Sequence, residues 1–419
     1  MECILEVIRT LPMGSCLSSD GWSGGRNPSS PASPASGARR QGGGIRRRRP
    51  SPEEEELDGI WERMCRNGAT SAASLFTQQG KKGTNQDAMI VWENFGDRSD
   101  TIFCGVFDGH GPNGHMVARK VRDILPLNLC ANLQLNAGNH DLKENNINIM
   151  NSEAIPSTIP QEDPRPPNGC DEKDRHSKFF KALKVSFLKT FRIVDKELRL
   201  HPEIDCFLSG TTAVTLVKQG EDLVIGNVGD SRAVLGTRDE NNCLIAVQLT
   251  TDLKPSLPRE AERIRRHRGR VFALKNEPEV ARVWLPNMNS PGLAMARAFG
   301  DFCLKDFGLI SVPEVSYRRV TAKDEFIVLA TDGVWDVLSN KDVVSIVASA
   351  PTRSSSARSL VESAARAWKL KYPTSKTDDC AVVCLFLNLD KPNSTVYRKD
   401  DQLNSIEVVS FYQSNGKHA

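Results

Sequence analysis

The sequence predicts an α+β fold with a central β-sandwich of two mainly antiparallel sheets, flanked by helices. Short apolar runs separated by turn residues recur from about residue 70 onward, and such runs are typical of strands. Several runs follow one another with no helical pattern between them, which argues against a doubly wound parallel sheet. The predicted strands are residues 88–95, 101–107, 212–217, 222–228, 233–236, 244–249, 326–330 and 381–387.

A smaller number of segments have the spacing of amphipathic helices. The clearest is 177–198, in which apolar side chains fall three or four residues apart and lysines lie opposite them. Two more helices are predicted at 114–125 and 357–370. We expect these helices to lie outside the two sheets. The apolar stripe of the first helix consists of Phe180, Leu183, Phe187, Phe191 and Val194.

Changes in composition divide the chain into three parts. Residues 1–69 form an arm rich in Gly, Ser, Pro and Arg, which we expect to be disordered because it cannot bury enough apolar surface. Residues 70–388 form one folded domain, interrupted by a polar surface insertion at about 134–176. Residues 389–419 form a C-terminal tail that is polar apart from IEVVSFY.

The overall composition is that of an ordinary soluble protein. With 39% hydrophobic and 26% charged residues and a net charge of +3, nucleic acid is not an expected partner. No stretch reaches about 18 consecutive apolar residues, so no membrane span is expected. The 11 cysteines include no CxxC pair, which favours reduced thiols over disulfides or a zinc site. We therefore expect the protein in the cytoplasm, the nucleus or both.

An internal methionine, Met13, begins MGSCLS, which matches the pattern for N-myristoylation and has a palmitoylatable Cys16 near by. Because other residues precede it, Gly14 has a free amino group only if translation starts at Met13. In that case two acyl chains would anchor the protein to the plasma membrane. The alternative is a chance match, and both interpretations stay open.

Acidic residues recur at the ends of the predicted strands. Asp108 follows FCGVF, Asp332 follows FIVLAT, Asp87 precedes AMIVW, and the pair Asp378-Asp379 precedes CAVVCLFL. If these strands lie side by side, the carboxylates converge and repel each other unless divalent cations lie among them. Oxygen ligands without accompanying His or Cys clusters favour Mg²⁺ or Mn²⁺ over zinc.

The chain resembles the metal-dependent type 2C serine/threonine protein phosphatases in a set of motifs that occur in order. These are GVFDGHG, SGTTAV, GNVGDSRAVLG, LTTDLKP, AMARAFGD, LATDGVWD and DDCAVV. The resemblance spans roughly residues 75–388, and the MGSC and NQD sequences are similar to those of plant members. That family folds as a β-sandwich flanked by helices, in agreement with the pattern of apolar runs.

The resemblance implies a site for two metal ions. Asp108 would bridge the ions, the carbonyl of Gly109 would be a further ligand, and Asp332 and Asp378 would complete the site. Asp378 is chosen over Asp379 because the ligand of the family's last motif precedes a small polar residue and then the strand.

The same resemblance implies further roles. Asp87 would hold metal-bound water. Asp230 and Asp336 match positions that bind a weaker third metal, together with Asp332, in some members. His110, beside the implied ligands, is the natural general acid for the departing serine or threonine oxygen.

The implied reaction is hydrolysis of phosphoserine and phosphothreonine in proteins by water that two Mg²⁺ or Mn²⁺ ions activate. The sequence contains no HCx₅R loop, so a phosphocysteine route is unsupported and no phosphoenzyme is expected. The expected partners are phosphoproteins, such as kinases or other signalling proteins, and we expect the protein itself to be a monomer.

Two departures from the family pattern support an alternative. Lys82 stands where the family often has Arg, and lysine lacks the bidentate fork that arginine offers to a phosphate. Gln86 stands where a glutamate is common, and the loss of this charge should raise the Mg²⁺ or Mn²⁺ requirement. The alternative is a catalytically weak pseudophosphatase that acts as a binding module or scaffold.

Overall fold

The computed structural model describes residues 64–138, 171–374 and 376–388. Most of the predicted arm, the centre of the polar insertion and the C-terminal tail lie outside the described residues, as does the MGSC sequence. Within the described ranges, no helix is long and apolar enough to cross a membrane. The eight cysteines of this part of the chain are thiols.

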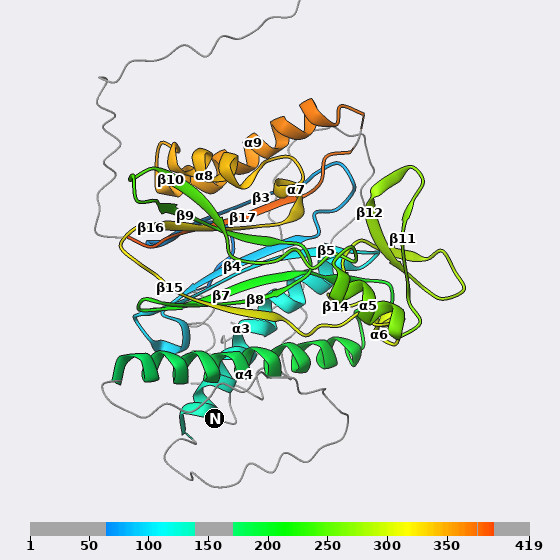
Figure 1. The fold of residues 1–419 in the computed structure, drawn as a ribbon, viewed down its shortest axis with the longest axis horizontal. Helices are drawn as coiled ribbons and strands as arrows, with labels where there is room; N and C mark the ends of the chain where they lie inside the picture. The colour runs from blue at the N-terminus through cyan, green and yellow to red at the C-terminus, as the bar shows by residue number, and fades with distance from the viewer. Residues whose placement is uncertain (1–63, 139–170, 375, 389–419) are drawn as a thin grey trace, which may run out of the picture.

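Two antiparallel sheets lie face to face and form the predicted sandwich (Figure 1). The first sheet has the order β1-β4-β5-β7-β8-β15, and the second has the order β10-β9-β16-β17-β3-β2. The strands of the first sheet are β1 (Met64–Cys65), β4 (Asp87–Glu93), β5 (Thr101–His110), β7 (Ala213–Gln219), β8 (Asp222–Val228) and β15 (Glu314–Arg319). Those of the second are β2 (Gly68–Ala69), β3 (Ala73–Gln78), β9 (Arg232–Arg238), β10 (Leu244–Gln248), β16 (Asp324–Ala330) and β17 (Cys380–Phe386).

Smaller strands extend this frame. β6 (Gly210–Thr211) pairs with both β5 and β14 (Phe299–Gly300) at the edge of the first sheet. A third sheet projects to one side of the sandwich (Figure 1). Its strands are β11 (Arg270–Leu274), β12 (Glu277–Trp284) and β13 (Pro291–Leu293).

Two pairs of helices cover the sandwich (Figure 1). α3 (Gly114–Gly138) and α4 (Asp171–Arg199) lie on the outer face of the first sheet, and α8 (Asn340–Ala348) and α9 (Ser356–Lys371) lie on that of the second. Short helices lie elsewhere: α5 (Pro258–Arg266), α6 (Phe302–Lys305), α7 (Asp332–Trp335), η1 (Phe95–Asp97) and η2 (Arg353–Ser355).

The core consists of three apolar layers. Successive side chains of a strand point to opposite faces, so on β5 Phe107 packs towards the helices while Val106 packs between the sheets. On β16, Ile327 packs between the sheets and Val328 packs towards α8 and α9. Because both faces of these strands are buried, their sequences are continuous apolar runs, which made them predictable.

All eight predicted strands and all three predicted helices form. Most ends differ by a few residues, but the helix predicted at 114–125 continues to residue 138. The sequence pattern did not predict β3, β15 or the third sheet. The segments of β15, β11 and most of β12 are only partly buried, so they lack a continuous apolar run. The segment of β3, ASLFTQ, mixes apolar with polar residues and therefore does not stand out.

Two predicted boundaries are wrong. Residues 64–69 contribute β1 and β2 to the sheets instead of belonging to the arm. The insertion is shorter than 134–176, because α3 continues to residue 138 and α4 begins at residue 171. Pro126 lies inside α3, and the buried Leu129 continues the apolar face of the helix beyond it.

The packing of α4 on the first sheet gives a test of the fold. Phe187 is fully buried, and a Cβ on Gly226 of β8 would lie 2.6 Å from its ring, so helix and strand are close. We expect Phe187→Ala to lower the free energy of unfolding by about 3–5 kcal/mol. Val185→Ala removes a side chain of the same helix that is 57% exposed, and it should change that energy by less than about 0.5 kcal/mol. Urea denaturation measures both, and equal losses would contradict this packing.

Asp324, at the start of β16, is a fully buried carboxylate. It accepts hydrogen bonds from Arg318 Nη2 (3.0 Å) and from the backbone N–H (2.8 Å) and hydroxyl (3.2 Å) of Thr321. Burial acts to raise the pKa of Asp324, but hydrogen bonds from Thr237, Thr321 and Arg318 outweigh it and lower this pKa below its usual value.

This lowered pKa predicts how stability depends on pH. Ionised Asp324 stabilises the fold above its unfolded-state pKa, near 3.9, and this contribution is lost as the pH falls through the lower folded-state pKa. Asp324→Asn should therefore be less stable than the wild type at pH 7, and the difference should shrink below about pH 4. Urea denaturation across this pH range tests the expectation, which fails if the difference does not change with pH.

Candidate active site

The four acidic strand ends lie together at one edge of the sandwich, and we call Asp87, Asp108, Asp332 and Asp378 the acidic mouth. Asp87 on β4 is directly opposite Asp108 on β5. In the second sheet, the end of β16 pairs with the beginning of β17, which brings Asp332 and Asp378 to the same end. The two sheets are linked there, because the hydroxyl of Thr331 donates to Asp87 Oδ2 at 2.7 Å.

Backbone contacts fix the position of Asp108. Its N–H donates to the hydroxyl of Thr212 (3.0 Å), and its carbonyl accepts from the N–H of Thr212 (2.9 Å) and the hydroxyl of Thr211 (3.0 Å). Gly109 must be glycine, because a Cβ there would lie 2.4 Å from the carbonyl oxygen of Gly114. The SGTTAV and DGHG motifs therefore hold each other in place.

Burial and electrostatic repulsion act together in the acidic mouth. Burial raises the pKa of Asp108 well above its usual value, and the charges of Asp332, Asp87 and Asp378 raise it further. Asp332 and Asp87 have raised pKa values for the same reasons: burial first, and then neighbouring carboxylates. A divalent cation would relieve this repulsion and stabilise the ionised form of every member.

Lys82 is a cation within reach of the acidic mouth. Its Nζ forms an ion pair with Asp378 Oδ2, and its side chain is 54% exposed. Burial acts to lower the pKa of Lys82, but the charges of Asp378, Asp332 and Asp108 outweigh it and raise this pKa. A lysine that is both charged and exposed beside the carboxylates can also approach an anionic ligand.

The chemistry of these side chains fits a hard divalent cation. All four donors are carboxylates, and the nearby Asp230 has a buried Oδ1 with no hydrogen-bond partner among the described residues. Across the described ranges, no three His, Cys, Asp or Glu side chains form a group that could hold a metal ion. Mg²⁺ does not require such a group, because it usually keeps several waters and takes only one or two carboxylates.

Asp378 and Asp379 have different surroundings. Asp379 is buried, and its two oxygens accept hydrogen bonds from the backbone N–H groups of Gly80 (2.7 Å) and Gln86 (2.9 Å). It thereby holds the loop that carries Lys82. Asp378 contacts Lys82 and lies within the repulsive field of Asp108 and Asp332. This difference favours Asp378 as the ligand.

The Gln86 side chain contacts the backbone around the site. Its Nε2 donates to the carbonyl of Gly111 at 3.0 Å, and a Cβ on Gly114 would lie 2.5 Å from its Oε1. The amide therefore packs against the turn after β5 and adds no charge to the acidic mouth.

The two residues predicted for a third metal lie close to the acidic mouth. Asp230, between β8 and β9, is 3% exposed and has an ion pair with Lys254 at 3.7 Å. Burial raises its pKa, Lys254 opposes this, and Asp252 and Asp336 add to it. Asp336, at the end of α7, is exposed, and its charge raises the pKa of Asp332.

His110 has a partner that the sequence reasoning missed. Its Nε2 lies 2.6 Å from Oδ2 of Asp301, a carboxylate that is 2% exposed. Burial acts to lower the pKa of His110, but the charge and hydrogen bond of Asp301 outweigh it and raise this pKa. Asp301 is the last residue of the motif AMARAFGD. Its place in that motif was the sequence signal that could have identified it as a site residue.

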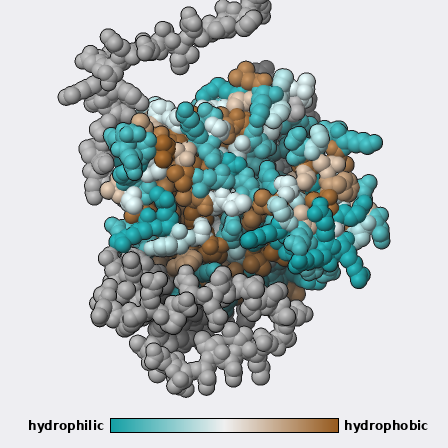
Figure 2. Space-filling view, viewed as in Figure 1, coloured by the Kyte–Doolittle hydropathy of each residue, from teal (hydrophilic) through white to brown (hydrophobic). Residues whose placement is uncertain are grey.

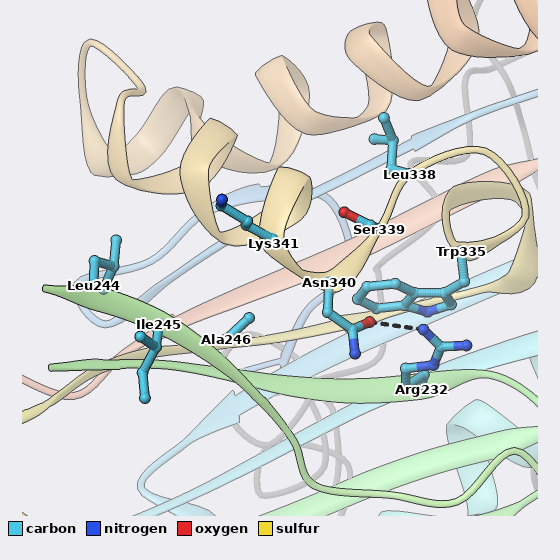
Figure 3. A pocket seen from close by; sticks show the side chains of 9 residues that line it. All are labelled: Arg232, Leu244, Ile245, Ala246, Trp335, Leu338, Ser339, Asn340 and Lys341. Atoms are coloured by element: carbon cyan, nitrogen blue, oxygen red, sulfur yellow. Dashed lines mark hydrogen bonds between the residues drawn. The ribbon is translucent and has the colours of Figure 1, made fainter. Parts of the chain in front are cut away.

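A groove of about 710 Å³ lies between β10 and α8, near apolar residues that reach the surface (Figures 2 and 3). Arg232 Nη1 donates to Asn340 Oδ1 at 2.7 Å, and its guanidinium lies 5.0 Å from the ring of Trp335. The groove is lined by none of the acidic mouth residues. It is therefore separate from the candidate active site.

Comparisons with known proteins agree with this fold. The family model described as Protein phosphatase 2C matches residues 157–369. The chain is 60% identical over 404 residues to "Probable protein phosphatase 2C 33" of Arabidopsis thaliana, covering 91% of this chain and 81% of that protein. It is 60% identical over 361 residues to "Probable protein phosphatase 2C 14" of Oryza sativa subsp. japonica, covering 86% and 68%.

A solved structure has a similar fold. It is that of a serine-threonine phosphatase 2C from Toxoplasma gondii, with a TM-score of 0.63 and 24% sequence identity. The match covers 77% of this chain and 99% of that chain. The two-sheet sandwich with flanking helices is therefore the fold of a known phosphatase.

The contrast between the two adjacent aspartates can be tested without any substrate. Asp379→Asn should lower the free energy of unfolding of the metal-free protein by about 1.5–3 kcal/mol, because charged hydrogen bonds to two backbone N–H groups are weakened. Asp378→Asn should weaken Mn²⁺ binding by at least about 10-fold while costing less stability. Urea denaturation and calorimetric titration with Mn²⁺ measure the two effects. The reverse assignment of effects would identify Asp379 as the ligand.

Proposed function

The chain belongs to the protein phosphatase 2C family of serine/threonine protein phosphatases, and we propose that it hydrolyses phosphoserine and phosphothreonine in other proteins with water as the nucleophile. The observation that carries this proposal is the acidic mouth, where four strands from two sheets bring carboxylates together. The proposed substrates are phosphoproteins, including kinases and other signalling proteins.

The family is generally dependent on Mg²⁺ or Mn²⁺, and we propose that this chain holds two such ions. Asp108, the Gly109 carbonyl, Asp332 and Asp378 would hold them, with Asp87 holding water beside them. When bound, the ions lower the pKa of water and screen the charge of the phosphoryl oxygens. A weaker third ion would use Asp230 and Asp336 together with Asp332.

The chain's own side chains would bind the phosphoryl group and supply a proton. Lys82 would attract a phosphoryl oxygen as a point charge. In the reaction, a bond forms between phosphorus and the oxygen of water, and the bond from phosphorus to the serine or threonine oxygen breaks. His110 would give its proton to that departing oxygen. The products are the free hydroxyl side chain and inorganic phosphate.

The environment of the neighbouring thiol supports a route without a phosphoenzyme. Cys380 lies beside the acidic mouth, but it is buried and donates to the carbonyl of Gly333 at 3.4 Å. Burial, followed by the charges of Asp87 and Asp378, raises the pKa of Cys380. A thiol in this state is a poor nucleophile, because the thiolate is the reactive form.

The second candidate function is a pseudophosphatase that binds phosphoproteins but hydrolyses them weakly. Gln86 favours it, because its amide contacts the carbonyl of Gly111 and leaves one negative charge fewer for the cations. Lys82 favours it as well, since a lysine cannot form a bidentate contact with a phosphate.

Activity measurements separate the two functions. We expect hydrolysis of p-nitrophenyl phosphate with millimolar Mn²⁺, loss of activity with EDTA and recovery on adding Mn²⁺ back. Asp332→Asn should lower kcat/KM by at least about 100-fold, because it removes a charge on which cation binding depends. Glu362→Gln, which removes an exposed charge on α9, is the matched control and should change it little. A correctly folded wild type that is inactive at every Mg²⁺ and Mn²⁺ concentration would support the pseudophosphatase.

A further inference from the structure

We infer that Asp301 is the positioning residue of His110, holding the imidazole in one orientation for proton transfer to the departing oxygen. The inference rests on the proposed function, in which His110 supplies that proton. It starts from the 2.6 Å contact between His110 Nε2 and Asp301 Oδ2, which joins residues far apart in the chain. Asp301 is 2% exposed and the His110 side chain is 19% exposed, so water competes little for this contact.

The local fold makes room for this pair. A Cβ on Gly210 would lie 2.2 Å from Asp301 Oδ2 and 2.7 Å from His110 Nε2. Any side chain at residue 210 would therefore push the carboxylate and the imidazole apart. The glycine of the SGTTAV motif is thus explained by the pair that it accommodates.

The backbone of Asp301 is also unusual. Its φ is +49°, in the left-handed region that residues other than glycine seldom adopt, and it follows Gly300 with a φ of +74°. Its N–H donates to the carbonyl of Ser209 at 2.9 Å. A conformation of this kind persists only where its surroundings enforce it, and such positions are concentrated at functional sites.

A second carboxylate, the partly buried Asp195 on α4, holds this turn from the other side. It accepts hydrogen bonds from the N–H of Gly300 (3.0 Å), Lys305 Nζ (2.7 Å) and the hydroxyl of Ser311 (3.0 Å). The turn is therefore fixed to α4, which covers the first sheet, as well as to the strand β6. Asp301 has little freedom to leave His110.

The contact determines which ring nitrogen keeps its hydrogen. Because Nε2 faces a carboxylate, it carries a hydrogen in either charge state of the ring. Nδ1 is buried and has no hydrogen-bond partner within the described ranges. Nε2 therefore stays paired with Asp301, and Asp301 acts through the orientation of the imidazole.

A purely structural role for Asp301 predicts a different kinetic result. A p-nitrophenolate ion leaves without a proton, whereas the alkoxide of serine or threonine needs one. Loss of the positioning residue should therefore slow only the second kind of substrate. Loss of a structural brace should slow both equally.

The test compares kcat/KM for a phosphothreonine peptide and for p-nitrophenyl phosphate at saturating Mn²⁺. Asp301→Asn should lower the peptide value by at least about 100-fold and the p-nitrophenyl phosphate value by less than about 5-fold. In a His110→Ala background, Asp301→Asn should have no further effect on the peptide. Asp195→Asn, which leaves Asp301 itself intact, should give a smaller loss with the same preference for the peptide. Asp324→Asn, which changes a buried ion-paired carboxylate elsewhere, should not change the ratio of the two values.

An NMR measurement on the metal-free ¹⁵N-labelled protein gives a readout that is independent of activity. We expect a protected, strongly downfield imidazole N–H at Nε2 of His110, assigned with His110→Gln, which is lost in Asp301→Asn. Absence of this signal in the wild type, or equal kinetic losses on both substrates, would overturn the inference alone. A wild type inactive on both substrates would overturn the proposed function together with the proton-transfer role.

Discussion

Repulsion among buried and half-buried carboxylates is the constraint on which the rest of this structure depends. Burial and then the charges of neighbouring carboxylates raise the pKa values of Asp87, Asp108 and Asp332, and a flexible chain would move these groups apart. The sandwich resists this because each acid follows or precedes a strand whose two faces are packed. Three apolar layers hold the strands, so the energy needed to keep the charges together comes from the core.

The groups around the acidic mouth act mainly through the backbone. Thr212 fixes Asp108, Asp379 fixes the loop of Lys82, and Gln86 fixes the turn after β5. Each contact joins segments distant in sequence, which places several motifs around one point. The arrangement explains why motifs spread over most of the chain belong to a single site.

Much of the fold and of the acidic mouth could be predicted from the sequence, because strands buried on both faces have continuous apolar runs and aspartates mark their ends. Partly buried elements such as β15 and β12 have no such signal. The partnership of His110 with Asp301 could not be predicted, because a contact across 191 residues depends on the pairing of β5, β6 and β14. The different roles of Asp378 and Asp379 depend likewise on which backbone N–H groups lie opposite them.

The third sheet has an apolar cluster of its own, in which Val283 and Leu293 pack with Ile264 and Leu304. Leu304 belongs to α6, which begins immediately after Asp301. Substitutions on the solvent side of β11 and β12 therefore affect a separate, small apolar cluster and leave the three central layers unchanged. This sheet is therefore a place where relatives that share the same chemistry can differ in the proteins that they bind.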